Sequence, residues 1–163
     1  MQYTLSILVE NQAGVLSKIS GLFSRRGFNI DSLAVGVTND PGVSRITIVA
    51  NGDEYVIEQL EKQLNKVIPV IKVKRLNDGD FISRELILIK VHCAASKRSE
   101  IIKTAEIMQA KIVDVAQSCV TVEYCETASR VETLIDLLRP YGIREIVRTG
   151  TVAIDKGTAA VSV

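Results

Sequence analysis

The chain has 163 residues, with 20 basic and 19 acidic side chains and a formal net charge of +1. This balance, with no long run of one sign, excludes strong electrostatic attraction to nucleic acid or to an anionic membrane, so we expect neither as a partner. The hydrophobic fraction is 47%, but aromatic residues make up only 4%. The length predicts one domain or two small ones, and the aliphatic surplus suits either dense cores or buried subunit contacts.

The first half of the chain predicts the order β-α-β-β-α-β. Apolar residues alternate with polar ones in four segments and recur at helical spacing in two others. The predicted strands cover residues 3–9, 30–38, 44–50 and 70–76, and the predicted helices cover residues 15–26 and 54–67. Gly27 is a natural C-terminal cap for the first helix. On the second strand the small residues Ser32, Ala34 and Gly36 share one face, which predicts a close neighbour there, such as a second subunit.

The second half repeats this element order after a polar stretch. The predicted strands cover residues 85–93, 112–116, 119–125 and 143–154, and the helices begin at Ser96, as a cap, and at a capping box from Ser129 to Glu132. The tail from Asp155 shows no pattern and is expected to be loose. The sequence therefore predicts an α+β protein with two ferredoxin-like βαββαβ domains in tandem, each an antiparallel sheet with helices on one face. The predicted domains are residues 1–76 and 84–163, with a linker at 77–83.

No set of residues predicts catalysis or metal binding. The single histidine, His92, precedes Cys93 on a predicted strand, where neighbouring side chains point to opposite faces. A buried structural cysteine and a surface or interface histidine explain the pair better than a nucleophile and its base. No His or Cys cluster has a metal-ligand spacing. The three cysteines form no CxxC pair, the N-terminus does not resemble a signal peptide, and no apolar run is long enough for a membrane span, so we expect a cytoplasmic protein.

RNA recognition is an alternative, because RNA-recognition modules share this element order. Residues 26–28 read Arg-Gly-Phe, as in one of their signatures, but they end a predicted helix instead of lying on the third strand. The predicted third strand has no aromatic residue, so the sequence disfavours RNA binding.

Residues 11–14 read Asn-Gln-Ala-Gly and connect the first strand to the first helix. A helix N-terminus offers free backbone N–H groups to a carboxylate, and Gly14 lets a ligand approach the backbone closely. Asn11 supplies both a donor and an acceptor, as the head of a free amino acid requires. An ordinary strand-to-helix turn, with Asn11 as the helix cap, is the alternative.

The chain also resembles a known family. The segment from Leu5 to Val49 resembles the ACT-domain ligand-binding module. The run LVENQAGVLSKISGLFSRRGFNIDSLAV is similar to the start of the small regulatory subunit of acetolactate synthase, also called acetohydroxyacid synthase (AHAS). The similarity continues through DPGVSRITI and EQLEKQLNKVIPVIKV, and RELILIKV resembles the start of the C-terminal domain of that family.

This resemblance implies a non-catalytic subunit of a transferase holoenzyme in branched-chain amino-acid biosynthesis. Its first domain is expected to bind valine for feedback inhibition and to pair with a second copy, and its second domain to activate the large catalytic subunit. The large subunit is expected to use thiamine diphosphate, Mg and FAD, while this chain needs no cofactor. The resemblance places the effector site at Asn11, Gln12, Ala13, Gly14, Val15 and Leu16 of one copy and Asn29 and Ile30 of the other, with Gly36 at the interface.

Two other functions stay open at this point. A free-standing ACT-domain amino-acid sensor with another target has the same effector site but no enzyme partner. A small enzyme that uses Cys93 or His92 requires a defined activity that substitution of either residue abolishes. Since one methylene changes binding in an apolar pocket by only about 1–3 kcal/mol, selectivity among valine, leucine and isoleucine is expected to be modest.

Overall fold

The computed structural model describes residues 1–163, which form two compact units. The first unit combines Met1–Ile82 with Thr151–Val163, and the second is Ser83–Gly150. Both units have the predicted βαββαβ order and an antiparallel sheet, which confirms the tandem ferredoxin-like fold class.

The first unit contains four long strands and two helices. They are β1 (Gln2–Glu10), α1 (Val15–Arg25), β2 (Asn29–Val37), β3 (Val43–Asn51), α2 (Glu54–Leu64) and β4 (Val70–Leu76). The sheet order is β2-β3-β1-β4, and every neighbouring pair is antiparallel. Strand β2 is therefore an edge strand, and it runs in the same direction as β1.

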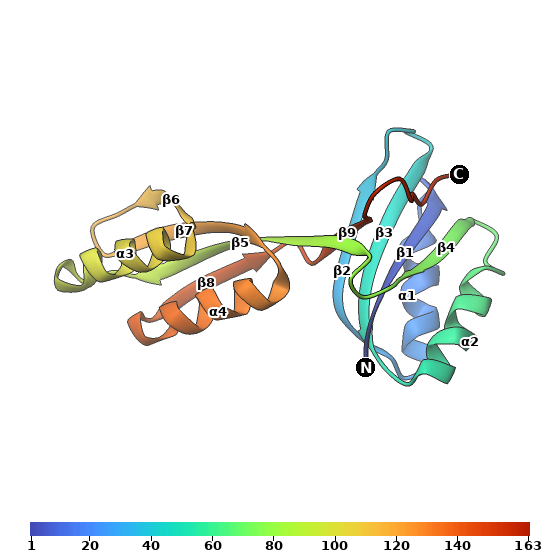
Figure 1. Ribbon diagram of the computed structural model, residues 1–163, viewed down its shortest axis with the longest axis horizontal. Helices are drawn as coiled ribbons and strands as arrows, with labels where there is room; N and C mark the ends of the chain where they lie inside the picture. Colours follow the sequence, from blue (N-terminus) through green and yellow to red (C-terminus); the bar gives the residue numbers. More distant parts are fainter. The chain divides into compact units, whose positions relative to one another are not determined.

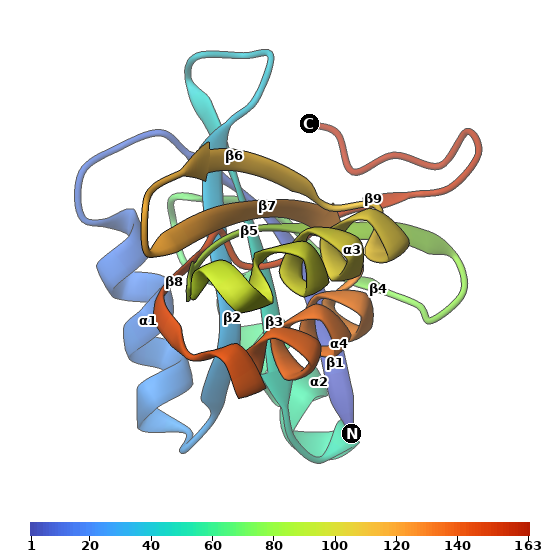
Figure 2. The same cartoon turned by 90° about the vertical axis from the view of Figure 1, so that its left-hand side faces the viewer.

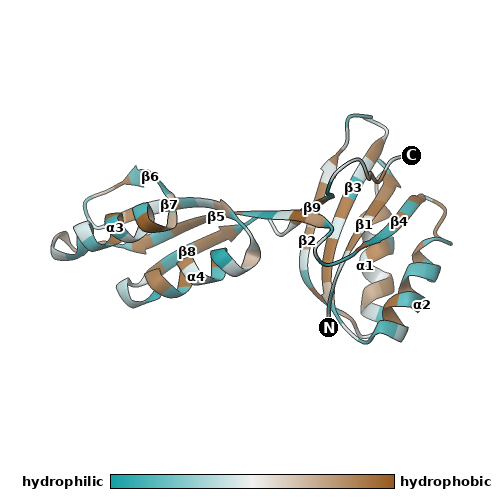
Figure 3. Ribbon diagram, in the orientation of Figure 1, coloured by the Kyte–Doolittle hydropathy of each residue, from teal (hydrophilic) through white to brown (hydrophobic).

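Both helices of the first unit cover one face of its sheet (Figure 1). Ile19 and Phe23 from α1 and Leu60 from α2 pack against Ile7 and Ile48 of the central strands. Apolar residues recur at helical spacing in α1 and α2 and at every second position in β1 and β3. These side chains therefore all face the layer between the helices and the sheet. The hydropathic colouring in Figure 3 shows brown segments along these strands and helices.

The opposite face of this sheet carries a second apolar cluster, formed with the end of the chain. Leu8, Val43 and Leu76 of the sheet pack with Ala153 and Val161, which are only 7% and 9% exposed. Ala153 lies in a short strand, β9 (Val152–Asp155), that pairs with β5. The expectation of a loose tail from Asp155 is therefore wrong, because apolar burial and hydrogen bonds hold this segment.

The second unit repeats the architecture. Its elements are β5 (Phe81–His92), which begins in the first unit, then a 3₁₀ turn η1 (Ala95–Lys97), α3 (Arg98–Met108), β6 (Lys111–Val115), β7 (Cys119–Glu126), α4 (Ala128–Leu138), a 3₁₀ turn η2 (Arg139–Tyr141) and β8 (Ile143–Arg148). The sheet order is β6-β7-β5-β8. Figure 2 shows α3 and α4 side by side across this sheet.

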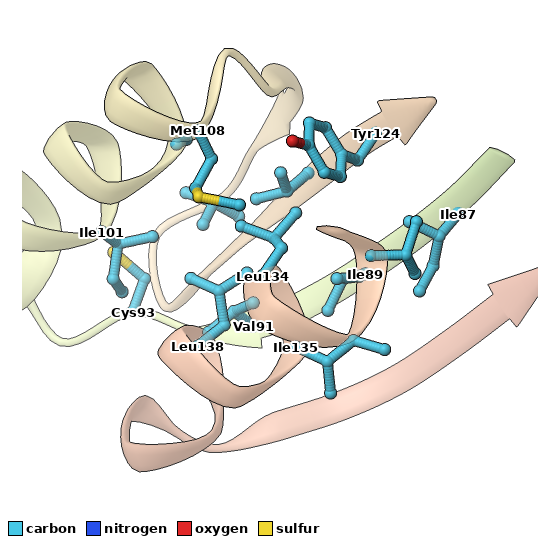
Figure 4. Packing of buried hydrophobic residues seen from close by; sticks show 14 residues of the cluster. Ile87, Ile89, Val91, Cys93, Ile101, Met108, Tyr124, Leu134, Ile135 and Leu138 are labelled. Atoms are coloured by element: carbon cyan, nitrogen blue, oxygen red, sulfur yellow. The ribbon is translucent and has the colours of Figure 1, made fainter. Parts of the chain in front are cut away.

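The core of the second unit lies between its sheet and the two helices. Figure 4 shows side chains of α3 and α4, among them Met108 and Leu134, facing those of β5 and β7. Cys93 is one of these core residues and is fully buried, whereas His92 is exposed beside Arg144. This confirms the predicted structural assignment of the two neighbouring side chains.

Two helix starts differ from the prediction. Ser96 lies within η1, and α3 begins at Arg98, whose guanidinium donates to the carbonyl oxygens of Ala116 and Gln117. The predicted capping box is also wrong. Helix α4 begins at Ala128 without a side-chain cap, and Glu132 instead pairs with Arg148 of β8 at 2.7 Å.

The predicted boundaries at the linker and at the last strand also need correction. Strand β5 begins at Phe81, inside the predicted linker 77–83, because Phe81 packs against the second apolar cluster of the first unit. The predicted strand 143–154 divides into β8 and β9, with Gly150 between them at a φ of 81°. As a result, residues 151–163 belong to the first unit and not to the predicted second domain 84–163.

Candidate functional site

The turn between β1 and α1 leaves the start of a helix open. Gly14 precedes the helix with φ 84° and ψ −9°, a left-handed conformation that glycine adopts at little cost. A Cβ atom added at Gly14 would meet no atom of other residues, apart from its chain neighbours, within 4 Å. No side chain caps α1, so the N–H groups of its first turn, at Val15, Leu16 and Ser17, have no intrahelical acceptor. Such a helix end attracts an anion.

Asn11 anchors this turn to the loop between β2 and β3. Its backbone N–H donates to the carbonyl oxygen of Gly42 at 2.8 Å, and its side-chain Nδ2 donates to that of Pro41 at 3.0 Å. Asn11 is therefore not the cap of α1, which removes the main support for an ordinary capping role. Since Nδ2 is engaged, the carbonyl oxygen Oδ1 of the same side chain is left as an acceptor.

The other residues predicted around the turn have different environments. Gln12 is exposed and donates to Glu10 at 2.8 Å, and Ala13 is exposed. Leu16 is 41% exposed, a high value for a large apolar side chain. Val15, by contrast, is 5% exposed and packs in the core under α1. Val15 therefore contributes a backbone N–H to the turn and a side chain to the core.

Asn29 and Ile30 lie at the other end of the same sheet. Asn29 pairs in register with Asn51, which pairs with Gln2 at the start of β1, whereas Asn11 follows the end of β1. The nine-residue strand β1 separates the two groups by roughly 27 Å. One chain therefore brings residues 11–16 together but does not bring Asn29 and Ile30 to them.

Asn29 belongs to a polar cluster that the sequence did not reveal. Its Nδ2 donates to Asp31 at 3.3 Å, and the same carboxylate accepts from the side chains of Asn51 and Gln2. Asp31 lies at an irregularity of the β2–β3 pairing, between Ile30 and Ser32. The alternation of β2 gave no signal for this cluster, because a bulge changes the register by one residue.

Gly36 lies near the far end of the edge strand β2, where the surface is apolar. Its neighbours Val35 and Val37 are 49% and 60% exposed, and a Cβ atom added at Gly36 would meet no atom, apart from its chain neighbours, within 4 Å. The carbonyl and amide groups on the outer side of an edge strand lack a partner strand within the chain. This edge is open to pairing.

None of the residues of the turn, 11–16, has a perturbed pKa, and the acidic groups that have one lie on other elements. Burial raises the pKa of Glu61 on α2, with Arg75 opposing the shift. A hydrogen bond from Lys97 lowers the pKa of Glu100 in the second unit. No group of three or more His, Cys, Asp or Glu side chains in the chain has the geometry to hold a metal ion, and none of its helices is long and apolar enough to cross a membrane. The turn thus offers backbone N–H groups and the side-chain amides of Asn11 and Gln12.

Comparison with known proteins identifies both units. Residues 5–72 match the family described as an AHAS small subunit-like ACT domain, so fold and match together define an ACT-domain protein. Residues 84–157 match the family described as small subunit of acetolactate synthase. The chain belongs to the acetolactate synthase small-subunit family.

Relatives match along nearly the whole chain. A probable acetolactate synthase small subunit of Archaeoglobus fulgidus is 48% identical over 157 residues, which cover 96% of this chain and 98% of the relative. The acetolactate synthase small subunit of Bacillus subtilis is 46% identical over 159 residues, which cover 97% and 92%. The crystal structure of the Thermotoga maritima small subunit, 40% identical, superposes with a TM-score of 0.89 and covers 98% of this chain and 99% of that one.

Proposed function

We propose that this chain is the non-catalytic regulatory subunit of acetolactate synthase. It binds the large, thiamine-diphosphate-dependent subunit, raises its activity and makes it sensitive to valine, in the cytoplasm. Full-length similarity to small subunits supports the enzyme partner. The uncapped start of α1 behind Gly14 is the observation that carries the effector role. Mg and FAD are expected on the large subunit, and this chain carries no cofactor.

The turn suits the polar head of an amino acid. The effector's carboxylate accepts hydrogen bonds from the free N–H groups at the start of α1, and Gly14 gives it access to the backbone. Its ammonium donates to Oδ1 of Asn11, whose orientation the bond to Pro41 holds. Leu16, with its exposed side chain, contributes an apolar wall for a branched aliphatic side chain.

A second copy completes the site in this proposal. Strands β1 and β2 both run antiparallel to β3, so the end of β2 and the turn at Asn11 share one end of the sheet. If two β2 edges pair antiparallel about a two-fold axis, Asn29 of one copy comes to the end of the sheet where its partner has Asn11 and Gly14. The exposed Val35 and Val37, with Gly36 between them, support this edge as the dimer contact.

Inhibition then follows from coupled equilibria. Valine bridges two copies, so it favours the dimer arrangement in which both halves of the site meet. Its effect on the large subunit cannot exceed its difference in affinity between the competing arrangements. The second unit, with its separate core, is assigned to activation of the large subunit as a prediction.

The test is a calorimetric titration of the purified chain with valine, leucine, isoleucine and alanine, followed by reconstitution with the large subunit. Saturable binding that prefers valine, and valine-sensitive activity only in the reconstituted enzyme, are the expected results. Acetolactate synthase turnover by the pure chain alone would contradict the non-catalytic assignment.

A free-standing amino-acid sensor is the second candidate, since the turn at Gly14 supports effector binding without specifying a target. Capture of partners from lysate on the immobilised chain separates the two. Recovery of the thiamine-diphosphate-dependent large subunit supports the first function. Effector binding without activation of that subunit on reconstitution supports the second.

A further inference from the structure

The end of the chain is bound to the face of the first sheet that its helices leave open. We call residues 151–163 the C-terminal strap. Three basic side chains of the sheet contact it. Arg45 donates to the carbonyl oxygen of Ala153 at 3.0 Å, Lys74 pairs with Asp155 at 2.9 Å, and Lys72 donates to the carbonyl oxygen of Ser162 at 3.1 Å.

The strap buries groups that a loose tail leaves in water. The side chain of Asp155 is only 6% exposed, and Ala153 and Val161 complete the apolar cluster with Leu8 and Val43. Buried carboxylates persist in proteins where a cation compensates them, as Lys74 and Arg45 do here. Charge and apolar complementarity together show a built interface and not an accidental contact.

The first residue of the strap is attached beside the Asn29 cluster. The N–H of Thr151 donates to Oγ of Ser32 at 2.6 Å. Ser32 follows Asp31 directly, and Asp31 holds the side chain of Asn29 at the irregularity of β2. One short piece of backbone therefore carries both the anchor of the strap and the carboxylate that orients Asn29.

We propose that the C-terminal strap is a regulatory device that sets the conformation of the β2 bulge and, through it, the position of Asn29. This rests on the proposed function of Asn29 as an effector contact. Attachment of the strap favours the bulge conformation that binds effector, and by linkage effector binding strengthens attachment of the strap. Release of the strap weakens effector binding without altering any residue of the site.

The test compares Ser32→Ala with Ser6→Ala in the full-length chain. Ser6 is a matched control on the same sheet face, because its buried hydroxyl has no hydrogen-bond partner. We expect Ser32→Ala to speed amide hydrogen exchange in residues 29–37 and 151–155. We also expect it to raise the valine Kd by up to roughly fivefold, the factor that corresponds to one ordinary hydrogen bond. Ser6→Ala should change neither quantity.

A second pair of variants tests the other end of the strap, with one variant that should release it and one control. Val161→Asp puts a charge into the apolar cluster, whereas Val163→Asp changes a residue that is 82% exposed. The regulatory role of the strap is supported if Val161→Asp, but not Val163→Asp, shows faster amide hydrogen exchange in the strap and weaker valine binding. Faster exchange of the strap with wild-type valine affinity in both Ser32→Ala and Val161→Asp overturns it.

The outcomes also separate this inference from the proposed function. If the wild-type chain binds no branched-chain amino acid, the proposed effector function fails. Amide hydrogen exchange alone then tests whether the strap is attached to the bulge. Faster exchange at residues 29–37 in Ser32→Ala supports the attachment, and unchanged exchange there overturns it.

Discussion

Gly14 has a left-handed backbone conformation and lies beside open space. Substitutions of the same shape but different charge separate the backbone cost from the effect on effector binding. The φ of 84° at Gly14 disfavours most side chains, but Asn and Asp tolerate this region better than others. We expect Gly14→Asn and Gly14→Asp to lose a similar free energy of unfolding, about 1 kcal/mol, measured by urea denaturation. Only Gly14→Asp should abolish valine binding and valine inhibition, because its carboxylate repels that of the effector. Activation of the large subunit should persist in both variants.

Gly14→Asn is the matched control in this experiment, since it has the same shape without the charge. Equal valine affinity in the two variants would show that the carboxylate of the effector does not lie at the start of α1.

Glu61 gives a pH-dependent prediction. Burial raises its pKa, Arg75 opposes this, and one carboxylate oxygen is buried without a hydrogen bond. A carboxyl whose pKa is higher in the folded than in the unfolded chain binds more protons when folded, so its ionisation costs stability as pH rises past its ordinary range. Glu61→Gln should therefore gain unfolding free energy relative to wild type between about pH 4 and about pH 7.

Denaturant unfolding at several pH values measures this difference, with the exposed Glu106→Gln as the control. If the unfolding free energy of wild type instead rises with pH relative to that of Glu61→Gln, the attraction between Arg75 and the Glu61 carboxylate outweighs the cost of burying that carboxylate.

Several residue-level predictions were correct because they depend on local chemistry. Gly27 has the expected positive φ after α1, and the alternation in the predicted strand 85–93 correctly indicated a buried Cys93 and an exposed His92. The hydrogen bonds of Asn11 were beyond prediction, because their acceptors at Pro41 and Gly42 are 30 or more residues away. Whether Asn11 and Gly14 bind an effector stays a prediction.

At the scale of elements, the end of α3 is a place where the sequence does not suit the backbone. Gln109 ends the helix in the left-handed conformation, with φ 62° and ψ 31°, and it is the only residue other than glycine with a positive φ. Gln109→Gly should raise the unfolding free energy by about 1 kcal/mol, because glycine removes the steric cost. Arg139→Gly, at the right-handed end of α4, should instead lower it.

Thermal and chemical unfolding of both variants measure these changes. The interpretation fails if Gln109→Gly is no more stable than wild type while Arg139→Gly loses stability as expected.

Element order was predictable, but the division of the last strand between the two units was not. Apolar periodicity reports whether a segment is helix or strand, and it did so for all the main helices and strands of both units. It does not report which of two apolar clusters a strand covers: β9 still pairs with β5, but its buried residue Ala153 packs in the second apolar cluster of the first unit. The alternation continues from Ile143 to Ile154, so only the turn at Gly150 and the contacts of Arg45 with Ala153 reveal that β9 belongs to the first unit.

At the scale of the whole molecule, the proposed effector site spans two chains, which mixing of variants tests. Gly14→Asp damages one half of each site and Asn29→Ala damages the other half. In a mixed dimer, one of the two sites carries both changes and the other carries neither. After subunit exchange, calorimetry should recover valine sites of wild-type affinity at about a quarter of the wild-type number.

The unmixed variants, and a mixture kept from exchanging, serve as controls. No recovery after exchange, with heterodimers shown by mass spectrometry, would mean that residues 11–16 and Asn29 do not form one site across the dimer.

The chain enters the second unit at Ser83 and returns to the first at Thr151. This arrangement has a consequence for synthesis on the ribosome. The four strands of the first sheet emerge early, yet one of its faces stays without its apolar cover until Thr151–Val163, which follow the second unit, have left the exit tunnel. Although domains usually complete their folding in the order of synthesis, here the unit that starts first is completed by residues made after the second unit. We expect a nascent or prematurely terminated chain without residues 151–163 to expose Leu8, Val43 and Leu76, apolar surface of the kind that chaperones and proteases bind.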